Sequence, residues 1–234
     1  MNRHSQEAER LRREYESRDQ GALKDFYSFS HAGNRFLFEK RNHEVQNILK
    51  AHAAFDMKGK KILEVGCGRG DWFKLFEEWG AQEKLLAGIE LEISRFEEAK
   101  KRFPEADLRL GEASTLPWQA RTFDIVLQST LFTSLLDLDY KKSVAAEMRR
   151  VLKPEGLILW YDFFYDNPKN SHVKGIGRTE IETLFPKCHV ALRRITLAPP
   201  LARWLAPKSW NACLLLEKMK IFNTHYAAVI RPKV

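Results

Sequence analysis

The chain has 234 residues, and its hydrophobic content of 44% is enough for one domain with a sizeable core. Its longest apolar runs fall far short of the roughly 20 residues that a membrane span needs. Residues 1–20 are charged throughout and lack the apolar stretch of a secretory signal. Cys67, Cys188 and Cys213 are odd in number and lack metal-ligand spacing. These features predict a reduced, cytoplasmic protein with no disulfide framework and no metal site.

The net charge of +8 lies in the last quarter of the chain. Residues 174–234 hold 11 Lys and Arg against 3 Asp and Glu, and the remainder holds 28 of each sign. Such an excess suits nucleic acid, an anionic membrane surface or an acidic substrate, and it is equally compatible with a basic surface that has no partner. No RNA-binding module accompanies it, so nucleic acid is the disfavoured partner.

Two helices are predicted before the main body of the chain. Residues 5–19 predict a charged helix, but their apolar content is thin, so this helix needs support from other elements. Residues 36–54 predict a better helix, with apolar side chains on about one face. Together these helices predict an N-terminal helical cap over residues 1–57.

From residue 58 onward the sequence alternates between strand and helix patterns. Helices are expected to begin at Asp71, at Ser94, which forms a capping box with Glu97, and near Asp139. Five strands in this alternation predict a doubly wound, mostly parallel sheet in an α/β fold. The five predicted strands are residues 61–66, 85–89, 107–110, 123–128 and, after a turn at 153–156, residues 157–161.

The last part of the chain predicts two further strands. Residues 189–197 and 224–230 would bring the sheet to seven strands, after a short helix capped by Thr179. Residues 199–222 are rich in Pro, Trp and Leu, and they predict a helical insertion before the last strand. Residues 58–234 would then form one ligand-binding domain.

Three glycines follow the first strand of that domain. Gly66, Gly68 and Gly70 remove three side chains within five residues, which lets a ligand approach the backbone closely. The loop opens a helix, whose N-terminal N–H groups favour a carboxylate or phosphate. The dinucleotide fingerprint G-x-G-x-x-G needs its last glycine at Asp71, so that fingerprint does not fit.

Several segments together resemble a known family. Residues 62–70, which read Ile-Leu-Glu-Val-Gly-Cys-Gly-Arg-Gly, resemble motif I of the class I (Rossmann-like) S-adenosylmethionine-dependent methyltransferases. Residues 111–118 look like the family's Asp-Ala-x-x-Leu-Pro segment, with Glu112 in place of the usual Asp. Residues 152–157 are similar to its Leu-x-Pro-Gly-Gly turn. The alternatives are a nucleotide-binding dehydrogenase and a degenerate, non-catalytic sheet.

The resemblance covers about residues 58–162 and implies S-adenosyl-L-methionine as the cofactor. Glu90 ends the second strand, where a carboxylate can accept both ribose hydroxyls of an adenosine; otherwise it is a solvated acid. Arg41 would pair with the cofactor carboxylate, or it is an ordinary surface arginine. The implied cofactor-binding residues are Glu64, Gly66, Cys67, Gly68, Gly70, Glu90, Leu91, Glu112, Ala113, Gln128, Ser129 and Arg41.

The acceptor side is predicted from the residues that end strands four and five and from the N-terminal helices. Asp162 is the acid or base to test first, since the end of strand five faces the cofactor crevice, and His31 and His225 are further catalytic candidates. Structural roles compete with all of these assignments. The candidate acceptor-binding residues are Tyr15, Tyr27, Phe132, Tyr165 and Asn167.

The expected protein is an enzyme that transfers a methyl group to oxygen or nitrogen of a small-molecule or glycan-linked metabolite. The chain from Tyr161 onward also looks like a type 11-like group of small bacterial methyltransferases associated with such pathways. The basic and apolar stretch 201–210 suits a lipid or isoprenoid-quinone acceptor at a membrane surface, and equally a lid or a homodimer contact. An RNA-binding protein and a non-catalytic cofactor-binding scaffold are the remaining alternatives.

Overall fold

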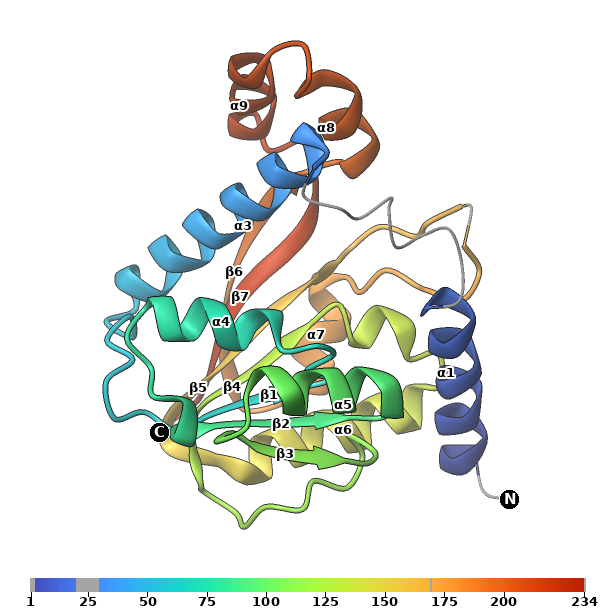
Figure 1. The fold of residues 1–234 in the computed structure, drawn as a ribbon, viewed down its shortest axis with the longest axis vertical. Helices are drawn as coiled ribbons and strands as arrows, with labels where there is room; N and C mark the ends of the chain where they lie inside the picture. The colour runs from blue at the N-terminus through green and yellow to red at the C-terminus, as the bar shows by residue number, and fades with distance from the viewer. Residues whose placement is uncertain (1–2, 20–29, 169, 234) are drawn as a thin grey trace.

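A sheet of seven strands among the described residues, in the order β3-β2-β1-β4-β5-β7-β6, forms the centre of the protein (Figure 1). The structure is a computed structural model that describes residues 3–19, 30–168 and 170–233. Strands β1 to β5 pair in parallel, and β7 runs antiparallel to both of its neighbours. The strands are β1 Ile62–Val65, β2 Leu86–Glu90, β3 Asp107–Leu110, β4 Phe123–Ser129, β5 Leu152–Phe163, β6 Cys188–Leu197 and β7 Asn223–Pro232.

Helices cover both faces of the sheet. Apolar residues of α3, α4 and α5 pack with one face of β1, β2 and β4, while α1, α6 and α7 pack on the other face. This doubly wound arrangement confirms the predicted fold class. The helices are α1 Arg3–Asp19, α3 Ala32–Ala51, α4 Asp71–Glu78, α5 Ile93–Arg102, α6 Leu138–Val151, α7 Arg178–Leu184, α8 Pro199–Leu205 and α9 Trp210–Lys218, with short 3₁₀ helices η1 Glu83–Leu85 and η2 Phe132–Ser134.

Two predicted helix caps are wrong. Glu92 caps α5, because its carboxylate accepts hydrogen bonds from the backbone nitrogens of Ser94 and Arg95, so Ser94 is inside the helix. Helix α7 begins after Gly177, which has no side chain to cap it, and Thr179 lies inside that helix. In both cases the residue type that commonly caps a helix is the second residue of the helix.

The predicted turn at 153–156 is part of β5. The pairing of β5 with β4 jumps from Phe123 opposite Leu152 to Ile125 opposite Leu157, so the intervening residues bulge out of the ladder. A bulge accommodates the Lys-Pro-Glu-Gly sequence without ending the strand, because the bulged residues need no ladder hydrogen bonds.

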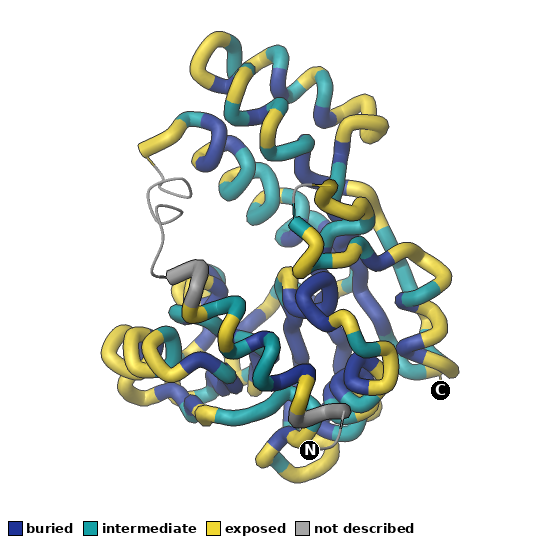
Figure 2. The backbone as a smooth tube through the Cα atoms, turned by 90° about the vertical axis from the view of Figure 1, so that its right-hand side faces the viewer, coloured by how far each residue is buried: buried dark blue, intermediate teal, exposed yellow. Residues whose placement is uncertain are grey.

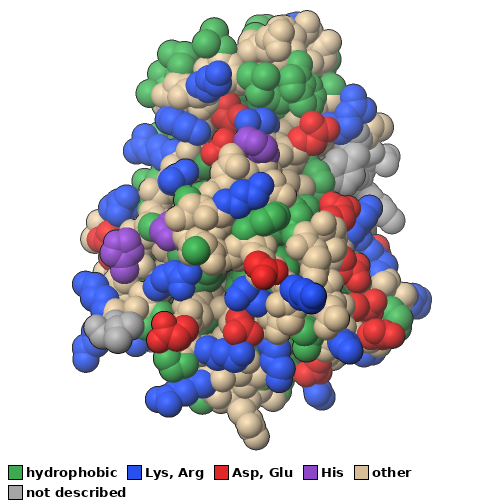
Figure 3. All heavy atoms as spheres, turned by 90° about the vertical axis from the view of Figure 1, so that its left-hand side faces the viewer, with side chains coloured by type: hydrophobic (Ala, Val, Ile, Leu, Met, Phe, Trp, Pro, Cys, Tyr) green, Lys and Arg blue, Asp and Glu red, His purple; other side chains and the backbone are tan. Residues whose placement is uncertain are grey.

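Helices α8 and α9 form the predicted insertion between β6 and β7, at the end of the molecule farthest from β3 (Figure 1). They have a small core of their own with the start of α3. The sheet holds most of the buried residues, and the helices at this end are more exposed (Figure 2), with hydrophobic side chains gathered on the surface there (Figure 3). This second core consists of Phe36, Leu197, Ala202, Ala206 and Cys213. The division of the chain at residues 57 and 58 stays a prediction.

Gly33 marks the closest approach between α3 and α8. A Cβ atom added to Gly33 would lie 2.4 Å from the Cα of Arg203 and 2.8 Å from its backbone nitrogen. Replacing a helical glycine by alanine ordinarily stabilises a protein by roughly 1 kcal/mol. We expect Gly33→Ala to lower the free energy of unfolding instead, by about 1–3 kcal/mol, because backbone atoms cannot move aside cheaply. Urea denaturation measures this change.

Gly177→Ala is the matched control for that experiment. Its added Cβ would have no atom within 4 Å, and its φ of −76° is open to any residue. Because glycine is a better N-cap than alanine, we expect its free energy of unfolding to fall by only about 0.5 kcal/mol, less than that of Gly33→Ala. A Gly33→Ala variant as stable as the control would show that α8 is not held tightly against α3.

Candidate functional site

A cavity of about 320 Å³ lies at the carboxyl ends of β1, β2 and β4. The strand order reverses between β1 and β4, and open α/β sheets bind their ligands in the crevice at such a switch point. Helices α1 and α3 contribute the remaining walls. The cavity is lined by the loop after β1 (Gly66, Cys67, Gly68, Arg69, Asp71, Trp72), by the ends of the neighbouring strands (Glu64, Ile89, Glu90, Leu91, Arg95, Gly111, Ala113), by the segment after β4 (Ser129, Thr130, Leu131, Ser134, Leu135, Tyr140), and by Leu11, Tyr15 and Arg41.

The glycine loop presents its backbone to the cavity. Gly66 and Gly68 have φ values of 74° and 54°, in the left-handed region that side chains rarely adopt. A Cβ atom added to Gly68 would meet nothing within 4 Å, because this position faces open space. The backbone nitrogens of Gly66 and Cys67 both donate to the carbonyl oxygen of Ile89, at 2.9 and 3.0 Å, which fixes the start of the loop against β2.

Gly70 has a different role from the other two glycines. It has a φ of 79°, and a Cβ atom added there would lie 2.7 Å from the ring of Phe103. It does not line the cavity. The glycine at this position lets the loop pack against the end of α5, so the structure does not place Gly70 among the ligand contacts predicted for it.

The buried carboxylate of Glu90 organises the loop. One of its oxygens accepts a hydrogen bond from the backbone nitrogen of Gly68 at 2.8 Å, and the other accepts from the backbone nitrogens of Leu91 and Glu92, each at 2.9 Å. Burial raises the pKa of Glu90, while these N–H groups lower it. Each oxygen has two lone pairs, so capacity remains for a ligand hydroxyl in the cavity.

Glu64 and Arg41 bring opposite charges to the same part of the cavity. Glu64 is only 2% exposed, and its Oε2 has no hydrogen-bond partner among the described residues. Burial raises its pKa well above the usual value, Asp71 adds to the increase, and Arg41 opposes it. A buried polar atom without a partner is rare in a native protein, and at a cavity it indicates a ligand group.

The guanidinium of Arg41 is held between aromatic rings, 4.4 Å from the centre of Trp72 and 4.8 Å from that of Phe38. It donates hydrogen bonds from Nε and Nη2 to Oδ1 of the neighbouring Asn42, at 3.1 and 3.0 Å. An α-amino acid group carries one ammonium and one carboxylate. The amino-acid end of S-adenosyl-L-methionine therefore fits the pair formed by Glu64 and Arg41.

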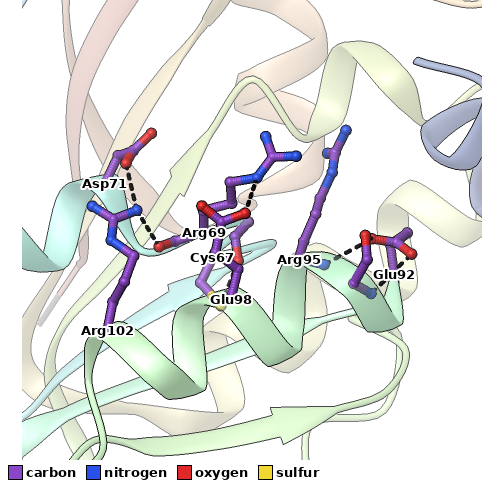
Figure 4. Close-up of polar contacts among 9 residues, drawn as sticks. Cys67, Arg69, Asp71, Glu92, Arg95, Glu98 and Arg102 are labelled. Carbon is purple, nitrogen blue, oxygen red and sulfur yellow. Dashed lines mark hydrogen bonds and ion pairs between the residues drawn. The ribbon is translucent and has the colours of Figure 1, made fainter. Parts of the chain in front are cut away.

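Ion pairs attach the loop and the start of α4 to α5 (Figure 4). Arg102 donates to Asp71 at 2.9 Å and to the carbonyl oxygen of Arg69 at 2.6 Å, and the side chain of Arg69 reaches Glu98 at 2.6 Å. These side chains are partly exposed, so each contact adds little stability by itself. Together they restrict the positions that the rim of the cavity can take.

Helix α1 closes the cavity from the side of β4. Tyr15 lines the cavity, and the guanidinium of Arg95 lies 4.5 Å from the centre of its ring. Glu7 accepts a hydrogen bond from the backbone nitrogen of Leu136 at 2.6 Å and forms an ion pair with Arg10. Helix α1 thereby finds the support that its sequence requires in the segment after β4.

Several predicted contacts are in the cavity, and others are elsewhere. Phe132 is fully buried beside Trp160, with ring centres 4.7 Å apart, so it belongs to the core. Gln128 is also fully buried, and its side chain bonds the backbone of Leu131 and Tyr161. The predicted residues that line the cavity are Glu64, Gly66, Cys67, Gly68, Glu90, Leu91, Ala113, Ser129, Arg41 and Tyr15; those that do not are Gly70, Glu112, Gln128, Phe132, Tyr165 and Asn167, and Tyr27 lies outside the described residues.

The three catalytic candidates are not brought together. His31 is exposed at the start of α3. His225 is buried between the rings of Tyr161 and Phe163, and burial, with a contribution from Arg41, lowers its pKa to about 3, which keeps it neutral. Neither lines the cavity. A catalytic role for either histidine therefore has no support from this geometry.

Asp162 is fully buried and attached to the segment after β4. Its Oδ1 accepts hydrogen bonds from the Thr133 hydroxyl at 2.7 Å and from the Phe163 nitrogen at 2.9 Å, and its Oδ2 accepts from the Thr133 nitrogen at 3.2 Å. Burial raises the pKa of Asp162 to about 7, although these hydrogen bonds oppose the increase. The carboxyl group fixes η2, whose last residue Ser134 and preceding residue Leu131 line the cavity. Asp162 is thus a positioning residue in this geometry.

Sequence reasoning missed 12 of the 22 residues that line the cavity. Half of the missed residues come from two places, the first turn of α4 and the segment after β4, and the others are spread over the remaining walls. The role of the segment after β4 could have been predicted from the sequence, because the segment that follows a central parallel strand must pass the switch point. The missed residues are Leu11, Arg69, Asp71, Trp72, Ile89, Arg95, Gly111, Thr130, Leu131, Ser134, Leu135 and Tyr140.

Residues 62–156 match a family model described as a methyltransferase domain. The chain is also similar to the demethylmenaquinone methyltransferase of Lactococcus lactis subsp. lactis, with 33% identity over 110 residues, which make up 44% of this chain and 42% of that protein. The matched regions span less than half the length of the first curated relatives. The match to the family model contains strands β1, β2 and β4, whose ends form the cavity.

Solved structures extend the likeness to most of the chain. The PH0226 protein from Pyrococcus horikoshii OT3 has a TM-score of 0.57 at 18% identity, over 82% of this chain and 91% of that one. The geranyl diphosphate C-methyltransferase of Streptomyces coelicolor A3(2), in complex with Mg²⁺, geranyl diphosphate and S-adenosyl-L-homocysteine, has a TM-score of 0.60 at 14% identity, over 83% of this chain and 81% of that one. At these identities the likeness establishes the fold.

The raised pKa of Asp162 predicts a pH dependence of stability. In the unfolded chain the carboxyl group has a pKa of about 3.9, so between that pH and about 7 the folded protein binds more protons than the unfolded one. Stability from this group is present below pH 4 and is lost as the pH rises towards 7, by at most about 1.4 kcal/mol per pH unit. We expect the stability deficit of Asp162→Asn relative to wild type to shrink between pH 5 and pH 8, as measured by urea denaturation.

Asp124→Asn is the control, because the pKa of Asp124 is shifted in the direction opposite to that of Asp162. Lys153 and the backbone of Lys61 hold the pKa of Asp124 below its usual value, despite partial burial. Its contribution is present above the unfolded pKa and is lost as the pH falls through the folded one, so its deficit stays constant between pH 5 and 8. A constant deficit for Asp162→Asn as well would contradict a buried carboxyl group that titrates near neutrality.

Proposed function

We propose that the chain transfers a methyl group from S-adenosyl-L-methionine to a small organic acceptor, because residues 62–156 match a methyltransferase domain and the fold is that of solved methyltransferases. The observation that carries this proposal is the buried, unpartnered oxygen of Glu64 opposite Arg41 in the cavity. The cofactor, when bound, supplies an activated methyl group on a positively charged sulfur. The residues of the chain bind it, orient it and exclude water.

Each part of the cofactor has a counterpart in the cavity wall. Glu64 suits the ammonium group and Arg41 the carboxylate, while Glu90 keeps one unused lone pair, on Oε2, for a ribose hydroxyl. Leu91 and Ala113 are partly buried apolar residues at the ends of β2 and β3, where the adenine would lie. Ser129 and Leu131 would face the reacting end.

Residues of α1 and of the segment after β4 would form the acceptor side of the cavity. Methyl transfer from a sulfonium has a good leaving group, so alignment of the acceptor contributes most and a dedicated base is not essential. This agrees with a wall in which neither Asp162 nor His225 reaches the cavity. Oxygen or nitrogen of a small-molecule or glycan-linked metabolite is the acceptor class that we propose first.

A lipid-like acceptor is the second candidate. Curated relatives from several bacteria bear the name demethylmenaquinone methyltransferase, at 27–33% identity over about half of this chain or less. The exposed apolar residues of α8 and α9 are compatible with an acceptor that is drawn from a membrane. A screen that detects S-adenosyl-L-homocysteine after incubation with polar metabolites and with short-chain quinones discriminates between the two classes.

Replacing Glu64 tests the cofactor assignment directly. We expect Glu64→Gln to weaken the binding of S-adenosyl-L-methionine about tenfold or more in calorimetry, because a charge-assisted hydrogen bond to the ammonium becomes a neutral one. Glu182→Gln is the control, since Glu182 is half exposed and pairs with Arg178 of α7, and neither residue lines the cavity. Equal affinities of wild type and Glu64→Gln would sink the assignment of this carboxylate.

A pair of glycine variants separates backbone strain from loss of the site. Gly68 and Gly59 both have positive φ, and an added Cβ atom would meet nothing within 4 Å at either position. Valine at either position should therefore cost similar stability, about 1–2 kcal/mol. We expect only Gly68→Val to weaken cofactor binding, because only Gly68 lines the cavity. Binding that is unchanged in Gly68→Val would contradict a cofactor at this loop.

Replacing Glu90 should affect both cofactor binding and stability. We expect Glu90→Ala to weaken binding of S-adenosyl-L-methionine and to lower the free energy of unfolding, because three backbone N–H groups lose their acceptor. Calorimetry and urea denaturation measure the two effects. Tight cofactor binding without release of S-adenosyl-L-homocysteine from any acceptor would favour the non-catalytic scaffold.

A further inference from the structure

Residues 199–222, which we call the tip, contain α8, α9 and the connection to β7. The tip lies at the end of the longest axis of the molecule, beyond the ends of β6 and β7 (Figure 1). It does not line the cavity. The proposed methyl transfer therefore leaves the chemistry of this segment without an explanation.

The tip exposes more apolar surface than its packing requires. Its buried residues Ala202, Ala206 and Cys213 already pack with Phe36 and Leu197 in the second core. Ten large hydrophobic residues are exposed in the described part of the chain, and five of them are in these 24 residues, so the exposure is concentrated rather than scattered. The five are Trp204, Leu215, Met219, Ile221 and Phe222, at 62%, 64%, 50%, 60% and 38% exposure.

The charges of the tip are nearly all positive. Lys208, Lys218 and Lys220 are exposed, and the Nζ of Lys208 lies 4.0 Å from the centre of the Trp204 ring. Glu217 is the single acidic residue in this stretch of sequence. It is 3% exposed and lies 3.4 Å from Lys40 of α3, so its charge does not reach the surface. The surface of the tip is thus basic and apolar.

We propose that the tip is a docking surface for an anionic lipid bilayer. Exposed Trp and aliphatic side chains gain free energy when they enter the headgroup and acyl boundary, and lysines beside them gain from the negative surface potential. The amphipathic Trp204 with Lys208 above it is suited to that boundary. A protein partner of matching chemistry would need an acidic rim and an apolar centre, whereas an anionic bilayer supplies both without a specific shape.

The docking would be peripheral. Among the described residues, no helix is long and apolar enough to cross a membrane. Helices α8 and α9 have 7 and 9 residues, so they can lie at the interface but cannot enter the hydrocarbon core deeply. The affinity would rest on a few side chains and on charge, and it would fall at high salt.

The tip is joined to the cavity through α3. Nε of Arg203 in α8 donates to Oδ1 of Asn34 at 2.9 Å, and Lys40 pairs with Glu217 of α9. Arg41, in the next position of α3, lines the cavity. A bilayer bound at the tip would therefore hold the cavity at a fixed distance and orientation from the membrane. The docking proposal does not depend on which acceptor the cavity takes.

Vesicle flotation with the full chain tests the proposal. The vesicles would be phosphatidylcholine alone, or phosphatidylcholine with phosphatidylglycerol at about two to one. We expect the wild type to float with the anionic vesicles and to remain behind with the neutral ones. The combined variant Trp204→Ser and Leu215→Ser should bind the anionic vesicles at least about tenfold more weakly, because it loses two inserting side chains.

Charge reversal tests the contribution of the lysines of the tip. Lys208→Glu with Lys220→Glu should abolish flotation, since each lysine near an anionic surface contributes about fivefold in affinity and each reversal adds repulsion. Matched controls change the same types of residue on the surface of the sheet domain. These are Ile93→Ser with Leu138→Ser, both about half exposed, and Lys84→Glu with Lys101→Glu, both exposed. The controls should float like the wild type.

Three results would overturn the docking proposal. The wild type fails to float with anionic vesicles, or the tip variants float as well as the controls, or light scattering shows a dimer that the apolar tip variant converts to a monomer without any vesicle binding. The last result would assign the surface to a second copy of the chain. All tip variants should keep wild-type affinity for S-adenosyl-L-methionine in solution, so failure here is distinguishable from failure of the methyltransferase assignment.

Discussion

The carboxylate of Glu90 is the contact on which the site depends. It accepts three backbone N–H groups from two segments that are far apart in sequence, the glycine loop and the turn after β2. Both segments leave the sheet at its carboxyl edge, where their backbone groups have no ladder partner. A single buried acid therefore satisfies the orphaned donors and fixes the distance between two walls of the cavity. Replacing it with an apolar residue would leave these three N–H groups without an acceptor.

Helix α3 connects this site to the rest of the molecule. Its C-terminal half packs on the sheet through Val45, Ile48 and Leu49, while its N-terminal half packs with α8 across Gly33. Arg41 lies between the two halves and enters the cavity from the middle of the helix. Because a helix is stiff, the position of this guanidinium is set by packing at both ends. The cofactor cavity and the insertion are therefore parts of one rigid arrangement along α3.

The sequence predicts the strands, the helices and the glycine loop, which depend on residue periodicity and sheet topology. It does not predict the helix caps and the side-chain orientations, which depend on local contacts. Alternating strands and helices, the glycine loop and the position of Glu90 follow from patterns along the chain. Serine often caps helices, so the pattern predicts Ser94 as the cap, yet Glu92 lies two residues earlier and accepts from the backbone nitrogens of Ser94 and Arg95 instead. Gln128 and Phe132 are near the switch point as predicted, but their side chains turn into the core. Strand direction fixes where a residue lies, and packing decides which way its side chain points.

The unpartnered carboxyl oxygen of Glu64 is consistent with this view of a site built for a ligand. A carboxyl group that is 2% exposed and has one oxygen without a partner among the described residues lowers the stability of the folded protein. Arg41, whose charge lowers the pKa of Glu64, makes hydrogen bonds to Asn42 and places its guanidinium over the Trp72 ring. Binding of an ammonium and a carboxylate would satisfy both groups at once, and the free energy of that binding adds to the stability of the folded state. A cavity that served only packing would have no reason to retain two such side chains.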